Sequence, residues 1–392
     1  MTIAPAILDK FKSLFKSPVI LHEPTFAGNE KKYLAECVDS TFVSSVGPFV
    51  TRFEQELAGY TGVKFAVATA NGTAALHTCL LLAGVKRDDE VLVPALTFVA
   101  TANAVAYCNA VPHFVDSSWK TLGICPEKLA DYLGAVAERR VDGTYNKKTN
   151  RKISACIPMH TFGHPVDMDP LVDLCNAYTI PVIEDAAEAL GSLYKGKHIG
   201  NAGALSALSF NGNKIITTGG GGAILTNDEA LAKKAKHLTT TAKVPHAWEF
   251  DHDMVGYNYR MPNINAALGC AQLEQLDKFI DQKRRLAQTY RKLFLGVDGV
   301  TVFEEPAHAT SNYWLNCLVL SERFRPERDT ILKTLNDNGV MMRPCWKLMN
   351  QLSMYKECPS ADLHTATEIV QSVINIPSSS HLISLIKDRD NG

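Results

Sequence analysis

The stretch SALSFNGNKIITTGGGGAIL, residues 206–225, determines how the rest of this chain is interpreted. An apolar run at 204–210 predicts a buried strand, which the polar Asn-Gly-Asn turn at 211–213 ends. Lys214 follows the turn, four glycines follow the lysine, and the apolar run 223–225 predicts a second strand. A lysine between two core strands is held by the scaffold, and partial desolvation favours the neutral amine that Schiff-base chemistry needs. The competing interpretation is a surface lysine in a hairpin loop, because most lysines are exposed.

The composition is that of an ordinary globular protein with balanced charge. The chain has 392 residues, 46% hydrophobic and 21% charged, with a formal net charge of -1. Because the 40 basic residues are balanced in number by 41 acidic ones, the net charge does not favour a nucleic acid or a membrane surface as a partner. The ten cysteines form no C-x-x-C pair, which is typical of free thiols in a reducing compartment. There is no signal peptide and no stretch of membrane-spanning length, so we expect a cytoplasmic protein.

A strand, a glycine-containing turn and a helix occur earlier in the chain. Residues 64–69 predict the strand and residues 74–84 the helix, with Asn71, Gly72 and Thr73 between them. The free N–H groups and positive dipole end of such a helix form an anion site, where glycine allows close approach and threonine adds a hydroxyl. A plain helix cap explains the same residues, since asparagine and threonine commonly cap helices.

Strands and helices continue to alternate beyond this unit, as in an α/β protein. Further strands are predicted at 90–94, 111–115, 153–158 and 180–185. The polar segment 142–152 is interpreted as an exposed loop, because the alternation resumes directly after it.

Acidic side chains gather where the strand 180–185 ends, at Glu184, Asp185 and Glu188. In open α/β sheets the ligand lies beyond the carboxyl ends of the strands. A carboxylate there can pair with a ring nitrogen, as a pyridine cofactor requires to act as an electron sink. A solvated or helix-capping acid is the competing explanation.

Two histidines, His160 and His164, are four positions apart, a spacing that on a helix would suit a metal. Gly163 and Pro165 argue against a helix there, and no third ligand is near in the sequence. We therefore expect no metal site.

The chain is expected to divide into a large domain, residues 1–275, and a small C-terminal domain, residues 276–392. One long helix over 264–295 would bridge them. Residues 6–16 predict a short amphipathic helix that packs on the body of the protein or on a partner. The polar residues 388–392 are expected to fray.

Together these features meet the needs of one cofactor, pyridoxal 5′-phosphate. Its aldehyde needs an amine, Lys214, and its ring nitrogen needs an acid, Asp185. Phe98, just past a strand, is the candidate partner for the ring face. Its phosphate needs N–H groups and hydroxyls, for which the candidates are Gly72, Thr73 and Ser209. The glycines at 219–222 do not fit a dinucleotide loop, because they run into a strand and open no helix.

Five stretches, in this order and spacing, carry a family resemblance: NGTAAL (71–76), PALTFVATANA (94–104), EDAAE (184–188), SFNGNK (209–214) and GYNYRM (256–261). On these residues the chain resembles, over nearly its whole length, the DegT/DnrJ/EryC1/StrS family of pyridoxal phosphate-dependent sugar aminotransferases. The resemblance implies an α/β protein of aminotransferase fold type I. Its large domain would hold a mixed, mostly parallel seven-stranded sheet flanked by helices, and its small C-terminal domain would be α+β.

The resemblance also implies residue roles. Lys214 would form the Schiff base and move protons, Asp185 would hold the pyridinium N–H, and Glu188 would lie near the ring hydroxyl. Phe98 would stack on the ring. The phosphate would be held by Asn71, Gly72, Thr73 and Ser209, and by Asn258 reaching over from a neighbouring subunit, so that the family's homodimer shares its active sites. Asn71 stands where serine is commoner, and Gly220-Gly221 where Gly-Glu is commoner, which affects only fine cofactor contacts.

Within the family, the chain is most similar to the LegC-type branch, on the stretches LHEPTFAGNE (21–30), STFVSSVG (40–47), TTTAKVPH (239–246) and SNYWLN (311–316). This resemblance implies amino transfer from L-glutamate to C4 of a nucleotide-linked 4-keto-6-deoxy-N-acetylhexosamine, with UDP as the expected carrier. The product would feed legionaminic acid or bacillosamine-type surface glycans.

Three alternatives accompany this expectation. One is amination of a GDP-linked or dTDP-linked 4-keto-6-deoxyhexose, as in a perosamine synthase. Another is a regulator that binds pyridoxal phosphate without catalysis, which the complete set of site residues and the lack of a DNA-binding segment disfavour. The third is sugar dehydration, for which relatives carry histidine in place of the lysine, whereas Lys214 is present here.

Overall fold

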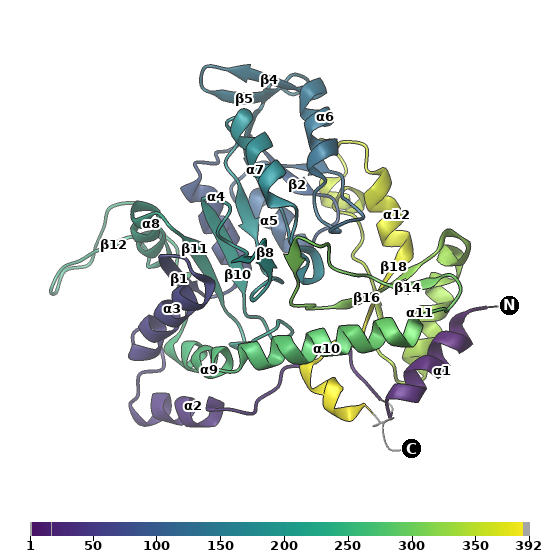
Figure 1. Cartoon of the computed structure of the whole chain (residues 1–392). Coiled ribbons are helices and arrows are strands. Elements are labelled where there is room, and N and C mark those ends of the chain that lie inside the picture. Colours follow the sequence, from purple (N-terminus) through teal and green to yellow (C-terminus); the bar gives the residue numbers. More distant parts are fainter. Residues whose placement is uncertain (1, 17, 387–392) are drawn as a thin grey trace.

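The protein is described by a computed structural model, which covers residues 2–16 and 18–386 (Figure 1). The segment 388–392, expected to fray, lies outside the described residues. None of the helices in the described part of the chain is long and apolar enough to cross a bilayer.

A central sheet organises the described part of the chain, and seven strands form it in the order β1-β11-β10-β7-β6-β2-β3. Parallel bridges from Cys156 to Val182 and from Met159 to Asp185 join β6 to β7. β11 runs antiparallel to both of its neighbours, and the other pairs run parallel. The mixed, mostly parallel seven-stranded sheet is thereby confirmed. Its strands are β1 (Phe65–Thr69), β2 (Glu90–Pro94), β3 (Val111–Val115), β6 (Lys152–Cys156), β7 (Ile183–Asp185), β10 (Leu205–Ser209) and β11 (Gly222–Thr226).

Helices cover both faces of this sheet because successive strand residues point to opposite sides (Figure 1). In β1, Val67 packs in one hydrophobic cluster, whereas Ala66 and Ala68 pack in the other. The Val67 face is covered by α4 (Gly72–Leu82), α5 (Val99–Tyr107) and α8 (Glu229–Thr239). The opposite face is covered by α3 (Pro48–Thr61), α6 (Pro126–Val136), α7 (Met168–Ala177) and α9 (Asn263–Leu273).

The C-terminal part of the chain builds an antiparallel sheet in the order β14-β16-β18-β17, with a hydrophobic cluster of its own. Helix α1 (Ala4–Leu14) packs here: the Phe11 ring lies 5.7 Å from the rings of Tyr290 and Phe294. The amphipathic N-terminal helix therefore packs against the C-terminal part of the same chain. The elements are β14 (Val300–Val302), β16 (Asn316–Leu320), β17 (Arg343–Pro344), β18 (Val373–Ile376), α10 (Leu276–Phe294), α11 (Arg328–Asp337) and α12 (His364–Ser372).

Smaller elements complete the fold. Figure 1 shows the hairpin of β12 (Lys243–Val244) and β13 (Asp251–His252) projecting from the body near α8. Helix α2 (Glu30–Asp39) lies beside α9. A three-stranded sheet contains β8 (Leu193–Tyr194), β9 (Lys197–His198) and β15 (Ala309–Thr310).

The single helix expected over 264–295 is wrong: the chain forms α9 and α10, which meet at Glu274 and Gln275. Contacts distant in sequence hold this break. Glu274 accepts a hydrogen bond of 2.6 Å from the Tyr33 hydroxyl, and Gln275 donates one of 2.8 Å to Glu30. Tertiary contacts have overridden a continuous helical pattern.

The loop expected over 142–152 is also wrong in part. Residues Gly143–Asn146 form β5, which pairs with β4 (Ala137–Arg140) and with the start of β6. Gly143 and Asn150 have positive φ values of 143° and 57°, which let the chain turn at both ends of β5.

Candidate active site

The carboxyl ends of the parallel strands surround a cavity of about 320 Å³. Eight of the nine predicted site residues line it: Asn71, Gly72, Thr73, Phe98, Asp185, Glu188, Ser209 and Lys214. Asn258 is exposed and lies outside the cavity lining of this single chain, on a segment that bridges to Thr240. Sequence reasoning therefore brought together residues that are distant in the chain and close in space.

Lys214 is held by the loop that joins β10 to β11. Phe210 donates its N–H to the Gly221 carbonyl over 2.8 Å, and the Lys214 N–H bonds to the Asn211 carbonyl over 3.0 Å. The lysine side chain is 12% exposed, and its Nζ lies 3.2 Å from Glu188 Oε1. Lys214 is thus neither a free surface lysine nor fully buried, and its amine faces the cavity.

The Glu188 side chain is 1% exposed. Its Oε2 accepts the Phe162 N–H over 2.9 Å, while Oε1 faces Lys214. Burial raises the pKa of Glu188 to about 7, although the Lys214 charge and the Phe162 N–H both oppose this shift. Glu188 can therefore take up or release a proton near neutral pH.

Asp185 ends β7 and is buried. Its Oδ2 accepts a hydrogen bond of 2.7 Å from the Thr101 hydroxyl, which in turn lies 2.7 Å from the Thr97 hydroxyl. Burial raises the pKa of Asp185, while the bonds from Thr101 and the Ala187 N–H and the charge of Lys214 favour its ionised form. Such an acid fits a cationic N–H partner, because the added positive charge would favour its ionised form.

The start of α4 forms a cradle against the end of β10. Asn71 caps the helix by accepting the Ala74 N–H over 2.8 Å, and the N–H groups of Gly72 and Thr73 precede the first intrahelical bond. A Cβ on Gly72 would lie 2.8 Å from Ser209 Cβ, so glycine is what lets Ser209 approach the helix start. N–H groups and hydroxyls at a helix N-terminus suit a phosphate. The helix cap and the anion site are thus compatible interpretations of Asn71.

Aromatic side chains also line the cavity. Phe98 is 48% exposed, and its ring lies 6.0 Å from that of Trp346. Trp346 and Trp314 also line the cavity. The sequence interpretation missed both tryptophans as well as Thr101. Trp314 lies in the branch-like stretch 311–316, which was the available signal, whereas nothing in the sequence placed Trp346 in the cavity.

The two histidines considered for a metal site contact different partners in the core. His160 bonds to Glu184 Oε2 over 3.2 Å and accepts the Val166 N–H, both within the core. His164 packs edge-on against the ring of Phe303, and burial lowers its pKa to about 3. Within residues 2–16 and 18–386, no group of three or more histidine, cysteine, aspartate or glutamate side chains could hold a metal ion.

A lysine amine, a buried acid and a phosphate cradle, set at the carboxyl edge of a mostly parallel sheet, fit pyridoxal phosphate by the chemistry of each donor. The class of protein that this fold and site define is the pyridoxal phosphate-dependent aminotransferases of fold type I. The chain belongs to the DegT/DnrJ/EryC1/StrS aminotransferase family, whose family profile matches residues 24–385.

Relatives within this family include enzymes named for different nucleotides. The chain is 40% identical over 337 residues to the GDP-perosamine synthase of Escherichia coli O157:H7, covering 86% of this chain and 87% of that protein. It is 31% identical over 333 residues to the UDP-4-amino-4,6-dideoxy-N-acetyl-beta-L-altrosamine transaminase of Campylobacter jejuni, covering 84% and 85%. The solved structure of Helicobacter pylori PseC, an aminotransferase involved in pseudoaminic acid biosynthesis, superposes with a TM-score of 0.83 at 25% identity, covering 92% and 93%.

Proposed function

We propose that this sugar aminotransferase transfers the amino group of L-glutamate to C4 of a UDP-linked 4-keto-6-deoxy-N-acetylhexosamine. The product would enter nonulosonic (legionaminic) acid or bacillosamine-type surface glycan synthesis. The observation that carries the proposal is the gathering of Lys214, Asp185 and Glu188 around one cavity at the sheet edge. The LegC-like stretches and the similarity to the Campylobacter jejuni UDP-4-amino-4,6-dideoxy-N-acetyl-beta-L-altrosamine transaminase support a UDP-linked N-acetyl sugar.

Three residues would take part in the chemistry: Lys214, Asp185 and Glu188. Bound pyridoxal phosphate supplies an electron sink for the transfer of the amino group. Lys214 would hold the cofactor by its aldehyde, and its amine would move protons at the reacting carbon. Asp185 pairs with the pyridine nitrogen and keeps it protonated. Glu188, 3.2 Å from the lysine amine, accepts or returns a proton near the ring hydroxyl.

The remaining residues hold the cofactor in place. Phe98 covers a ring face, and Asn258 reaches the phosphate of a partner subunit in a homodimer. Exposed apolar side chains on and beside the hairpin of β12 and β13 support such an interface: Trp248, Phe250 and Val255 are 77%, 81% and 83% exposed. The phosphate is held by Asn71, Gly72, Thr73 and Ser209. A division into a large domain, 1–275, and a small one, 276–392, and a cytoplasmic location belong to the same proposal.

A second candidate is amination of a GDP-linked 4-keto-6-deoxyhexose. The 40% identity to a GDP-perosamine synthase favours it. The two candidates share the cofactor and the roles of the site residues, and differ in the nucleotide and in the N-acetyl group.

One experiment tests both candidates. The visible spectrum of the purified, cofactor-loaded protein is recorded with excess L-glutamate, and again after the UDP-linked keto sugar is added. We expect the cofactor band to disappear with glutamate and to return with this sugar, but not with the GDP-linked analogue. A return with the GDP-linked sugar alone would select the second candidate. Lys214→Ala serves as the control, and turnover by this variant at the wild-type rate would overturn the assignment of the lysine.

A further inference from the structure

The reactive lysine is covered by a tryptophan from a distant part of the chain. Trp314 precedes β16, whereas Lys214 belongs to the loop between β10 and β11. The Lys214 Nζ lies 4.2 Å from the centre of the Trp314 ring. An ammonium group over an indole face is a favourable cation–π contact, stronger when water is excluded. Trp314 is 4% exposed and the Lys214 side chain is 12% exposed, so the contact lies at the cavity wall, largely screened from bulk solvent.

Trp314 also contacts the backbone that carries the lysine. Its Nε1–H donates a hydrogen bond of 2.7 Å to the Asn213 carbonyl, and Asn213 directly precedes Lys214. One side chain therefore fixes both ends of the lysine: the ring contacts the amine and the ring N–H contacts the peptide. A residue whose only function was to fill space would need neither contact.

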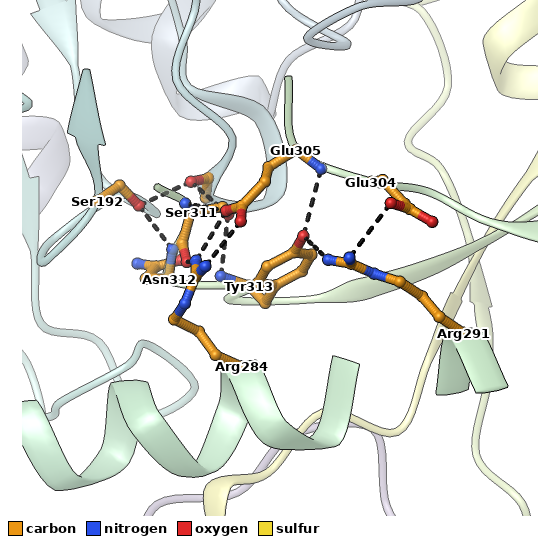
Figure 2. A network of polar contacts seen from close by, with 9 residues as sticks. Ser192, Arg284, Arg291, Glu304, Glu305, Ser311, Asn312 and Tyr313 are labelled. Carbon is orange, nitrogen blue, oxygen red and sulfur yellow. Dashed lines mark hydrogen bonds and ion pairs between the residues drawn. The ribbon is translucent and has the colours of Figure 1, made fainter. Parts of the chain in front are cut away.

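The turn that carries Trp314 is held from several sides (Figure 2). Asn312 accepts the Trp314 N–H over 2.8 Å and donates to the carbonyls of Glu188 and Leu190, over 2.9 Å each. Tyr313, which is 1% exposed, has a φ of 48°, a conformation that non-glycine residues rarely adopt. Asn312 thereby fixes Trp314 and the backbone of Glu188 relative to each other. The Trp314 ring and the Glu188 carboxylate both contact the lysine amine.

The rest of the network in Figure 2 fixes this turn to α10 and to the central part of the chain. Arg284 donates to the Ser311 carbonyl over 2.7 Å and pairs with Glu305. Ser192 accepts the Asn312 N–H over 2.9 Å. These bonds hold a turn whose Tyr313 backbone has a sparsely populated conformation, and with it the residue that follows, Trp314.

We propose that Trp314 is a positioning residue for Lys214: its indole ring holds the charged lysine amine beside Glu188 whenever the amine is not bound to the cofactor. The inference rests on the proposed role of Lys214. Three titratable groups also act on this amine, Glu188, Asp185 and His22. Substitution of Trp314 alters none of these side chains, and of the three only His22 has a ring packed against that of Trp314, with centroids 6.4 Å apart.

Competitive labelling with acetic anhydride tests the proposal, because the reagent attacks only neutral amines. Acetylation of Lys214 is measured by peptide mass spectrometry at pH 7, relative to Lys233, whose side chain is 75% exposed. The full chain is labelled without cofactor, and also after loading with pyridoxal phosphate and treatment with L-glutamate. We expect Trp314→Leu to raise the relative labelling of Lys214 about 5- to 30-fold, the factor of a desolvated cation–π contact.

Two further variants separate this role from simple opening of the cavity. Trp314→Phe retains an aromatic face and should label within about threefold of the wild type. Trp346→Leu opens the same cavity and should leave the labelling unchanged, since Trp346 packs on Phe98 and Phe162. In the glutamate half-reaction, Trp314→Leu should lower kcat and leave KM unchanged. Trp314→Met replaces the leucine variant if the latter loses its far-ultraviolet circular dichroism.

Unchanged labelling in Trp314→Leu, or an equal rise in Trp346→Leu, would overturn the proposal. The result on the cofactor-free chain does not depend on any reaction with glutamate. A protein that fails to react with glutamate would therefore overturn the proposed function and still give a result on Trp314.

Discussion

Glu188 Oε1 and Lys214 Nζ lie 3.2 Å apart, and burial raises the pKa of Glu188 to about 7 even with the lysine charge beside it. The cost of removing a carboxylate from water outweighs its attraction to the lysine. Glu188 can therefore bind or release a proton near neutral pH, as a group that moves protons during catalysis requires.

The raised pKa of Glu188 predicts how Glu188→Gln changes the pH dependence of stability. Because the folded-state pKa of about 7 lies above the usual value of 4.5, the folded chain binds a proton that the unfolded chain releases between these values. The free energy of unfolding of the cofactor-free wild type should thus fall from pH 5 to pH 7.5 by about 2–3 kcal/mol more than that of Glu188→Gln. Urea unfolding at several pH values measures this difference. Glu304→Gln, an exposed site, should follow the wild type; parallel curves for all three proteins would contradict the prediction.

Thr101→Val should weaken cofactor binding. The variant loses the 2.7 Å hydrogen bond to Asp185 and with it a group that favours the charged form of this acid. We expect the Kd for pyridoxal phosphate to rise about 5- to 30-fold, equivalent to about 1–2 kcal/mol. Thr97→Val is the matched control, because Thr97 reaches Asp185 only through Thr101, and its effect should stay within about threefold. Fluorescence titration of the cofactor-free chain gives both constants, and equal effects would argue against a direct role of Thr101.

Lys283 predicts a pH dependence of the opposite sign. Its amine is fully buried, donates to the Trp314 and Ser378 carbonyls, and has a pKa lowered by burial to about 7. Since this pKa lies below the ordinary value of 10.5, the unfolded chain binds a proton that the folded chain has released, and stability should rise from pH 7 to pH 9. From pH 7 to pH 9, the free energy of unfolding should rise by about 2–3 kcal/mol less in Lys283→Met than in the wild type.

The measurement is again urea unfolding, with the slopes compared and not the absolute stabilities, because Lys283→Met also leaves two carbonyls without a donor. Lys278→Met removes an exposed lysine of the same helix and should retain the wild-type slope. A wild-type slope in Lys283→Met would show that this amine does not titrate in the range.

Gly72→Ala should damage the phosphate cradle. The added Cβ would lie 2.8 Å from Ser209 Cβ, so α4 and β10 would have to separate at the proposed phosphate site. We expect the affinity for pyridoxal phosphate to fall at least tenfold, about 1.4 kcal/mol. Gly212→Ala, in the turn before Lys214, meets no atom within 4 Å and should bind the cofactor normally. The absorbance of the cofactor band after dialysis measures cofactor retention in both variants. Full retention by Gly72→Ala would contradict the assignment of this helix start as the phosphate site.

The central sheet and most of its site could be predicted because both depend on local patterns. Apolar runs indicate strands that end at one edge: Asp185 is the last residue of such a run, and Lys214 and Gly72 lie in glycine-containing turns that follow one. Positions set by long-range contacts could not be predicted. The break at Gln275 depends on Glu30, and the place of Trp314 over Lys214 depends on a hydrogen bond between residues 101 positions apart. Sequence patterns describe one element at a time, whereas these contacts depend on how elements pack.

The reversal of β11 has a mechanical consequence for the reactive lysine. A parallel strand after β10 would require a crossover of a dozen or more residues to the far edge of the sheet. β11 runs antiparallel to β10, so the loop 210–221 leaves and re-enters the sheet at the same edge. The loop that carries Lys214 is thus joined at both ends to neighbouring strands of the central sheet. The backbone of Lys214 is therefore positioned by two core strands, and only its side chain has rotational freedom toward the cavity.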